Sequence, residues 1–183
     1  MLVVCTGNIC RSPAAELLLR HRLGPGSGIG VASAGIHALA GAPVAEPMAA
    51  LLRERGIAVD GWTARQLDPD EVRRSAVVLT MTGDQRSAVV RRAPGAVRRA
   101  FTLQEFADIA RLSPGEPGTG PAERLAALVT AAPIARAQRT SDGDDIEDPY
   151  RREAAVFERV LARIETAVDA VVAALVPEPA HSA

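Results

Sequence analysis

The stretch Val3-Val4-Cys5-Thr6-Gly7-Asn8-Ile9-Cys10-Arg11-Ser12-Pro13 decides the fold class of this chain. It continues a short apolar run, Met1–Val4, that is typical of a buried strand. It ends at Ser12, which suits a helix N-cap, and at Pro13, which suits the first position of a helix. The helix predicted from there ends ahead of Gly24-Pro25-Gly26. A strand, a loop and a helix in this order are typical of the opening unit of an α/β fold.

The rest of the chain repeats this alternation. We predict further strands at residues 30–34, 76–81 and 97–101, and helices at residues 43–55, 84–92, 103–112 and 153–175. Strands that alternate with helices indicate a parallel sheet covered by helices on both faces. In the last helix, large apolar side chains recur every three or four residues, at Phe157, Leu161, Ile164, Val168, Val171 and Leu175. This spacing fits a helix docked on a sheet better than a coiled-coil seam.

One region, residues 113–145, interrupts the alternation. Its first part, Ser113–Pro121, is rich in Gly and Pro, which predicts turns and mobility, whereas residues 122–139 can form an Ala-rich helix. The region holds too few large apolar residues for a second core. We therefore expect a partly mobile insertion within a single domain of residues 1–176, followed by a disordered tail at residues 177–183.

Composition narrows the classes of function. The chain has 183 residues, and 21 basic against 22 acidic side chains leave a formal net charge of −1, which disfavours a strongly basic nucleic-acid binder and a polybasic membrane contact. No apolar run approaches the roughly 20 residues of a membrane span, and the first residues lack the basic segment of a secretory signal. Two cysteines are too few for a disulfide scaffold, so we expect a reducing, cytoplasmic compartment. All 21 basic residues are Arg, which by itself indicates no function.

Metal chemistry has no sequence support. His21 and His181 are too far from each other and from the cysteines along the chain to predict a metal site. We therefore expect neither a metal nor a cofactor.

The decisive stretch also carries the chemistry. Cys5, five residues and then Arg11 is the spacing of a phosphate-cradling loop, here at the carboxyl edge of the predicted sheet, where open α/β folds bind ligands. Successive backbone N–H groups curl around one anion, and the dipole of the following helix favours negative charge. Arg11 can hold two phosphate oxygens at once, which Lys cannot do in planar fashion. The same positive field favours the thiolate of Cys5, which is the nucleophilic form.

The remaining loop residues have expected supporting roles. We expect the Ser12 hydroxyl to hydrogen-bond the sulfur, Gly7 to adopt a positive φ, and Asn8 to tie the loop to its flanks. Thr6, Ile9 and Cys10 complete the predicted phosphate-binding loop. The Gly-Lys-Ser/Thr ending of a nucleotide-binding P-loop is missing from this stretch.

Further motifs then follow in an order typical of one family. They are Cys5–Pro13, Ser33-Ala34-Gly35, Ala64-Arg65-Gln66-Leu67, Leu79-Thr80-Met81 and Asp148-Pro149-Tyr150. On these segments the chain resembles the low-molecular-weight protein tyrosine phosphatase family, over residues 1–112 and 146–175. The resemblance implies a four-stranded parallel sheet and metal-independent hydrolysis of phosphotyrosine in proteins through a phosphocysteine intermediate. It also implies Cys5 as nucleophile, Arg11 as the group that binds phosphate and stabilises the transition state, and Asp148 as general acid.

Asp148 is singled out mainly by the resemblance. A carboxylic acid on a loop can protonate a leaving phenolate and then activate water, and Pro149 keeps Asp148 out of helical geometry. Taken alone, however, Asp148 belongs to an acidic run, residues 142–148, of the kind that is normally solvated surface.

Three residues have two interpretations each, and a fourth, Ile9, bears on the substrate. Tyr150 can stack on a substrate ring or cover the core at the loop exit. His37 lies where the family places a variable loop near the pocket mouth, although a solvated loop His is the more ordinary interpretation. Cys10 is either a small buried filler or the partner of Cys5 in a reversible disulfide. Ile9 offers an apolar wall for an aromatic ring, where the arginine-phosphatase branch of the family carries Thr.

Substrate and partner follow from the same resemblance. Asp148-Pro149-Tyr150-Arg151 is similar to bacterial members that dephosphorylate tyrosine kinases in polysaccharide export, so we expect a phosphotyrosine protein, such as a tyrosine kinase, as partner. A protein-arginine phosphatase and an arsenate reductase using a small-thiol partner remain alternatives. A non-catalytic phosphate-binding module is disfavoured, because it would need neither Cys5 nor Asp148.

Overall fold

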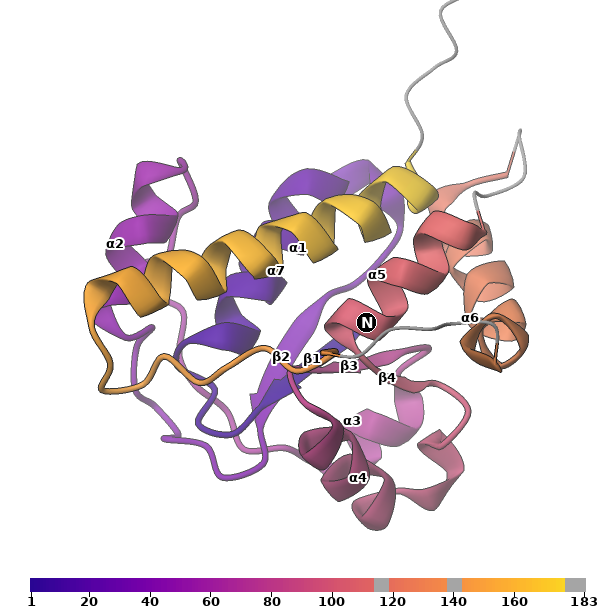
Figure 1. Ribbon diagram of the computed structural model, residues 1–183, viewed down its shortest axis with the longest axis horizontal. Helices are drawn as coiled ribbons and strands as arrows, with labels where there is room; N and C mark the ends of the chain where they lie inside the picture. The colour runs from indigo at the N-terminus through magenta and orange to yellow at the C-terminus, as the bar shows by residue number, and fades with distance from the viewer. Residues whose placement is uncertain (114–118, 138–142, 177–183) are drawn as a thin grey trace, which may run out of the picture.

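The computed structural model, which describes residues 1–113, 119–137 and 143–176, contains a four-stranded parallel sheet between two layers of helices (Figure 1). The strands are β1 (Leu2–Cys5), β2 (Ala32–Gly35), β3 (Val78–Thr80) and β4 (Ala100–Thr102). They lie in the order β2-β1-β3-β4, and every neighbouring pair is parallel. The predicted fold class is confirmed.

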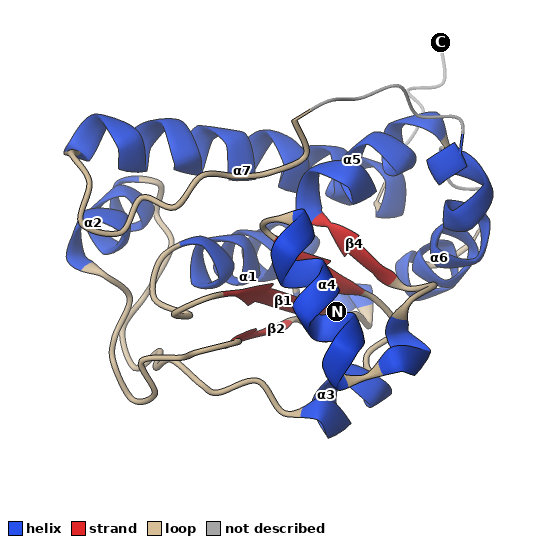
Figure 2. Ribbon diagram, turned by 60° about the horizontal axis from the view of Figure 1, so that its bottom comes forward, coloured by secondary structure: helices blue, strands red, loops and turns tan. Residues whose placement is uncertain are grey.

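Helices cover the two faces unequally (Figure 2). The larger core contains residues of α1 (Arg11–Leu23), α2 (Glu46–Glu54), α5 (Leu103–Leu112), α6 (Pro121–Ala137) and α7 (Ala154–Leu175). The smaller core contains residues of α3 (Pro69–Arg74), α4 (Gly83–Arg92) and the short 3₁₀ helix η2 (Pro94–Ala96); a second such helix, η1, spans Pro25–Ser27. Side chains of a strand alternate between faces, so β1 sends Val3 into the larger core and Leu2 and Val4 into the smaller one. Both faces of the strands are therefore buried, which explains their continuous apolar character.

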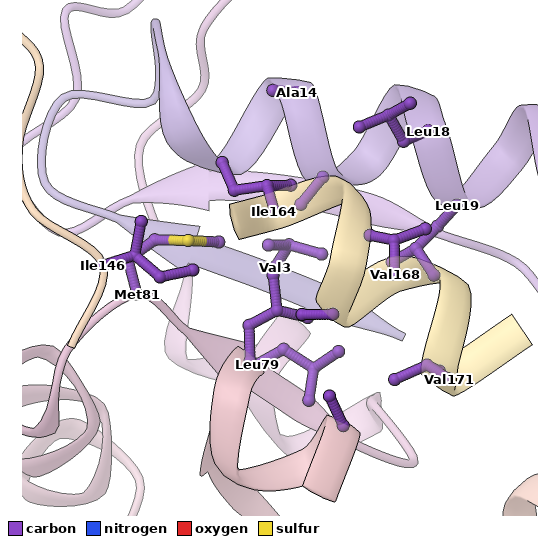
Figure 3. Packing of buried hydrophobic residues seen from close by; sticks show 14 of the residues in the cluster. Val3, Ala14, Leu18, Leu19, Leu79, Met81, Ile146, Ile164, Val168 and Val171 are labelled. Atoms are coloured by element: carbon purple, nitrogen blue, oxygen red, sulfur yellow. The ribbon is translucent and has the colours of Figure 1, made fainter. Parts of the chain in front are cut away.

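The last helix docks on the sheet as its spacing predicts. All six of its periodic apolar residues are buried, none with more than 3% of its surface exposed. Figure 3 shows Ile164, Val168 and Val171 of α7 packed close to Val3 and Leu79 of the strands. The helix begins at Ala154, one residue later than predicted.

Two predictions about the first loop and helix are wrong. Helix α1 begins at Arg11 with Cys10 as its N-cap, so Ser12 lies inside the first turn and its hydroxyl serves the loop instead. The residue with positive φ is Asn8, at 54°, and not Gly7. Asn tolerates the left-handed region better than most residues, and here its side chain is held by hydrogen bonds.

Other element boundaries also moved. Helix α2 begins at Glu46 and not at Pro43, because the preceding residues form a loop in which the Ala45 N–H donates to the Ile9 carbonyl. Strand β4 begins at Ala100 and not at Val97, because residues 97–99 form a turn after η2, in which the Arg99 N–H donates to the Ala96 carbonyl. Helix α3 was not predicted; it is six residues long and begins after an Asp68 N-cap.

Arginine side chains cover both edges of the sheet. On the β2 side, the Nε atoms of Arg20 and Arg65 donate to the carbonyls of Val31 and Ser33 at 2.9 Å. On the β4 side, Nη2 of Arg136 in α6 donates to the Ala100 carbonyl at 3.0 Å. Outer strands present unpaired carbonyls, and these guanidinium groups satisfy them.

Helix α6 lies within the region predicted as an insertion. It matches the predicted helix at residues 122–139, whose last two residues lie outside the described part of the chain, as do residues 114–118 and the predicted tail at 177–183. Its Arg136 pairs with Glu105 and lies 4.5 Å from the centre of the Phe101 ring. In the described ranges, no helix is long and apolar enough to cross a membrane.

Candidate functional site

The loop between β1 and α1 turns its carbonyl groups away from its centre. The carbonyl oxygens of Cys5, Thr6 and Gly7 accept hydrogen bonds from N–H groups of residues 36–39. The N–H groups of Gly7 and Ile9 have no partner within the described part of the chain. The loop therefore keeps free N–H donors together at the N-terminus of a helix, an arrangement that binds anions.

Gly35 allows this close contact with the 36–39 segment. A Cβ atom at Gly35 would lie 2.6 Å from the Thr6 carbonyl oxygen and 2.9 Å from Cα of Ala38. Both are backbone atoms that cannot move aside easily. Only glycine fits where β2 ends against the loop.

The Cys5 sulfur lies at the base of this loop. Cys5 is 2% exposed, its Sγ is 2.9 Å from Oγ of Ser12, and it accepts a hydrogen bond of 3.3 Å from the Asn8 N–H. The predicted contact between Ser12 and the sulfur is present. Both neighbours can donate to a thiolate, so the sulfur is held as an oriented nucleophile.

The side chain of Asn8 fixes the shape of the loop. Its Nδ2 donates to the hydroxyls of Ser12 and Ser33, each at 2.8 Å, and its Oδ1 accepts from the Arg65 N–H at 2.8 Å. Ser33 in turn donates to the buried carboxylate of Glu16. The network holds Asn8 in its left-handed conformation. Ser33 and Arg65 lie in quoted motif segments, whereas nothing in the sequence pattern pointed to Glu16.

Arg11 connects the loop to a segment more than 130 residues away. It is 3% exposed; its Nη1 donates to the Ile146 carbonyl at 3.1 Å, and its Nη2 lies 2.6 Å from Oδ2 of Asp148. Its Nε is buried and, among the described residues, has no hydrogen-bond partner. A buried, unpaired donor on a guanidinium indicates a place for an anion.

Asp148 reaches the site from a well-anchored loop. Ile146 is fully buried near Met81 (Figure 3), and its N–H donates to the Met81 carbonyl at 2.8 Å. Two residues later, half of the Asp148 side-chain surface is exposed, and its Oδ1 accepts from the Tyr150 N–H at 3.2 Å. Ile146 thus fixes the start of a short segment, and the partly exposed Asp148 at its end lies against Arg11.

Two other acidic residues of the 142–148 run, Asp145 and Glu147, contact other parts of the protein. Oδ1 of Asp145 accepts from the Gly83 N–H at the start of α4. Glu147 pairs with Arg159 of α7, and the hydrogen bond from Arg159 holds the pKa of Glu147 below its usual range. Among the described residues of the run, Asp148 is the acid that pairs with Arg11.

A cavity of about 200 Å³ opens above the loop. It is lined by Cys5, Thr6, Gly7, Ile9, Cys10, Arg11, His37, Leu39, Asp148 and Tyr150. All the predicted catalytic and pocket residues therefore meet at one place, with Asn8 and Ser12 behind it. Leu39 was missed; its sequence signal is a large apolar residue among the mostly small residues of 37–43, and 48% of its surface is exposed.

Cys10 is held as a neutral thiol. It is 4% exposed, and burial raises its pKa to about 12, with the neighbouring Cys5 and Asp148 adding to the effect and Arg11 opposing it. At neutral pH little of Cys10 is therefore in the thiolate form.

Comparison with known proteins groups the chain with one family. The model of the family described as low molecular weight phosphotyrosine protein phosphatase matches residues 1–130. The chain is 33% identical over 170 residues to the probable low molecular weight protein-tyrosine-phosphatase EpsP of Ralstonia solanacearum, covering 93% of this chain and 91% of that protein. It is 35% identical over 123 residues to a protein-arginine-phosphatase of Geobacillus stearothermophilus, covering 67% of this chain and 81% of that one.

Solved structures lead to the same grouping. The tyrosine phosphatase AmsI of Erwinia amylovora superimposes with a TM-score of 0.72 at 27% identity, covering 96% of this chain and 91% of that one. The arginine phosphatase YwlE of Geobacillus stearothermophilus superimposes with a TM-score of 0.70 at 30% identity, covering 93% and 88%. The two neighbours carry different substrate names on one fold, so the fold alone does not choose between the substrates.

Proposed function

Because this chain belongs to the low molecular weight phosphotyrosine protein phosphatase family, we propose that it hydrolyses phosphotyrosine in proteins with Cys5, Arg11 and Asp148 as its catalytic residues. One observation supports this assignment above the others. The three side chains come from two segments that are far apart in sequence, and they line one cavity with free N–H donors at its base.

Substrate binding begins with an exchange of anions. In the free site the Asp148 carboxylate lies 2.6 Å from Arg11, where it neutralises the guanidinium. A phosphate group bound by the loop N–H groups and Arg11 takes over that charge, and the unpaired Nε gains an acceptor. Asp148 is thereby released toward the bridging oxygen of the substrate.

The first chemical step transfers the phosphoryl group to sulfur. The Cys5 thiolate attacks phosphorus, the S–P bond forms and the P–O bond to the phenol breaks. Asp148, which has taken up a proton from solvent after its release from Arg11, gives this proton to the leaving phenolate oxygen and becomes a carboxylate again. Arg11 and the loop N–H groups stabilise the charge on the equatorial oxygens in the transition state.

The second step restores the free protein. The Asp148 carboxylate accepts a proton from a water molecule that attacks the phosphocysteine. The S–P bond breaks, inorganic phosphate leaves and the Cys5 thiolate returns. Ser12 and the Asn8 N–H, in contact with the sulfur, stabilise it as a leaving group.

The cavity walls favour an aromatic substrate. Ile9, Leu39 and Tyr150 supply apolar surface around the mouth, which suits a phenyl ring. Phosphoarginine is the second candidate, because one similar protein is an arginine phosphatase. We place the substrates among phosphotyrosine proteins of the cytoplasm, a tyrosine kinase among them.

A substrate panel tests the proposed function. We expect the protein to hydrolyse a phosphotyrosine peptide faster than matched phosphoarginine and phosphoserine peptides, with release of inorganic phosphate as the readout. A higher kcat/KM for phosphoarginine would reassign the substrate. Arsenate-dependent oxidation of a small thiol, in the absence of phosphatase turnover, would instead favour the reductase alternative.

We also propose that Cys10 protects Cys5 from irreversible oxidation. Peroxide converts the Cys5 thiolate to a sulfenic acid; sulfur of Cys10 then attacks it, water leaves, and a disulfide forms that an added dithiol reduces. Both cysteines are free and buried in the structure. Because the pKa of Cys10 is raised to about 12, its thiolate is scarce at neutral pH and becomes more abundant as the pH rises.

The corresponding prediction is a reversible, pH-dependent inactivation. After peroxide treatment we expect a Cys5–Cys10 linkage in mass spectra, recovery of activity with dithiothreitol, and faster disulfide closure at pH 9 than at pH 7. Cys10→Ser should lose the recovery but remain as sensitive to inactivation by peroxide. Full recovery in Cys10→Ser, or no linkage in the wild type, would refute the protective role.

A further inference from the structure

The turn that follows Asp148 holds an arginine in an unusual backbone conformation. The Arg152 N–H donates to the Pro149 carbonyl at 2.9 Å, which closes a four-residue turn. Arg151, the third residue of this turn, has φ of 60°, whereas Tyr150 does not have a positive φ. This is the pattern of a type II turn, in which the third position favours glycine. A strained, non-glycine residue beside a ligand site is a reason to look for a function.

The side chain of Arg151 lies at the rim of the cavity. Its guanidinium carbon is 5.2 Å from the centre of the Tyr150 ring, within the range of a cation–π contact. The Tyr150 ring lines the cavity, and 44% of the surface of Tyr150 is exposed. The stacked guanidinium is thus placed beside the wall that a substrate ring would meet.

No acidic side chain in the described part of the chain neutralises the charge of Arg151. Arg151 is exposed and forms no ion pair with any residue of the described ranges. Two arginines of α7 near the same loop are engaged differently: Arg159 pairs with Glu147, and Arg163 donates to the Asp145 carbonyl. A rim cation held by an aromatic ring and left without a counterion is available to an anionic group of a ligand.

We propose that Arg151 is a specificity residue that pairs with an Asp or Glu side chain adjoining the phosphotyrosine of the substrate. The inference rests on the proposed function of the cavity, in which Arg11 binds the phosphate. Consecutive residues of an extended peptide are less than about 4 Å apart, so a side chain one or two positions from the phosphotyrosine passes over the rim. The substrate class is therefore an acidic phosphotyrosine segment.

The test compares two phosphotyrosine peptides that differ only in having Glu or Gln on both sides of the phosphotyrosine. At low salt we expect the wild type to show a kcat/KM about two- to fivefold higher for the Glu peptide, the size of an exposed ion pair. The difference should lie in KM, because the contact is made equally in the ground and transition states, and it should shrink as salt is added.

Three variants identify the source of the preference. Arg151→Gly removes the cation while supplying the residue that the turn favours. The ratio of kcat/KM for the Glu peptide to kcat/KM for the Gln peptide should therefore fall to about one without loss of the fold. Arg151→Lys should retain part of the ratio, since the charge remains but the planar stacking is weaker. Arg98→Ala is the control. Arg98 is an exposed arginine just before the first residue of β4, at the amino ends of the strands, whereas the cavity lies at their carboxyl ends, so this substitution should leave the ratio unchanged.

The outcomes separate the two proposals. A Glu preference that persists in Arg151→Gly, or its absence in the wild type, would overturn the role of Arg151 while the Gln peptide is still hydrolysed. Failure of the wild type to hydrolyse either peptide in a Cys5-dependent manner would overturn the proposed function and this inference with it.

Discussion

Replacement of Cys5 by Ser is expected to abolish turnover, with a loss of about 10⁴-fold or more in kcat. The serine hydroxyl is a far weaker nucleophile than a thiolate at neutral pH. Neither neighbour of the sulfur, Ser12 at 2.9 Å or the Asn8 N–H at 3.3 Å, can act as a general base for it. The measurement is steady-state hydrolysis of a phosphotyrosine peptide by the wild type and the variant.

Binding of inorganic phosphate provides the control for this variant. The N–H donors of the loop and Arg11 are unchanged in Cys5→Ser, so titration calorimetry should show phosphate affinity close to that of the wild type. Retained binding with lost turnover identifies the sulfur as the reacting atom. Hydrolysis that survives the substitution would contradict the phosphocysteine mechanism.

Replacement of Asp148 by Asn is expected to have the second-largest effect. With a phosphotyrosine peptide, loss of the proton donor should lower kcat by about 10²- to 10⁴-fold. An aryl phosphate with an activated leaving group, such as a nitrophenol, needs little protonation and should lose much less rate in this step. The diagnostic quantity is the ratio of the two losses, and an equal loss for both substrates would argue against the acid role.

Phosphate binding by Asp148→Asn and a control substitution at Glu147 complete the test of Asp148. The Asp148→Asn variant has no carboxylate to neutralise Arg11, so it should bind inorganic phosphate more tightly than the wild type. Glu147→Gln removes one negative charge a single residue away, from a side chain that pairs with Arg159 rather than Arg11. The control variant should keep both the leaving-group dependence and the phosphate affinity of the wild type.

The structure also offers a physical reason why all 21 basic residues of the chain are arginine. Apart from Arg11, many guanidinium groups bind backbone carbonyls: Arg99 alone donates to the carbonyls of Val72, Arg73, Ser75 and Gly95. A planar group with five donors can reach several carbonyls at once, which an ammonium group cannot do as well. Composition alone had offered no structural interpretation of this preference.

Local sequence was sufficient for the framework of the protein. The apolar run, the Cys5-to-Arg11 spacing and the helix that follows are all encoded within residues 1–23, so strand, loop and helix could be predicted without knowledge of distant contacts. The period of the last helix likewise predicts its buried face. The short helix α3 was not predicted, because six residues carry too little periodicity to distinguish a helix from a loop.

The sequence by itself was enough to predict the fold class and to single out Cys5 as candidate nucleophile and Arg11 as candidate phosphate-binding residue, because these predictions depend on neighbouring residues with fixed spacing. Only the tertiary structure showed how Asp148, which the family resemblance had singled out, meets Arg11: burial of Ile146 directs the loop and sets Asp148 against the guanidinium. It also decided that Asn8 rather than Gly7 adopts the left-handed conformation, since the hydrogen-bond partners that hold Asn8 come from segments far along the chain. Contacts of this kind depend on the packing of distant elements, which no local pattern records.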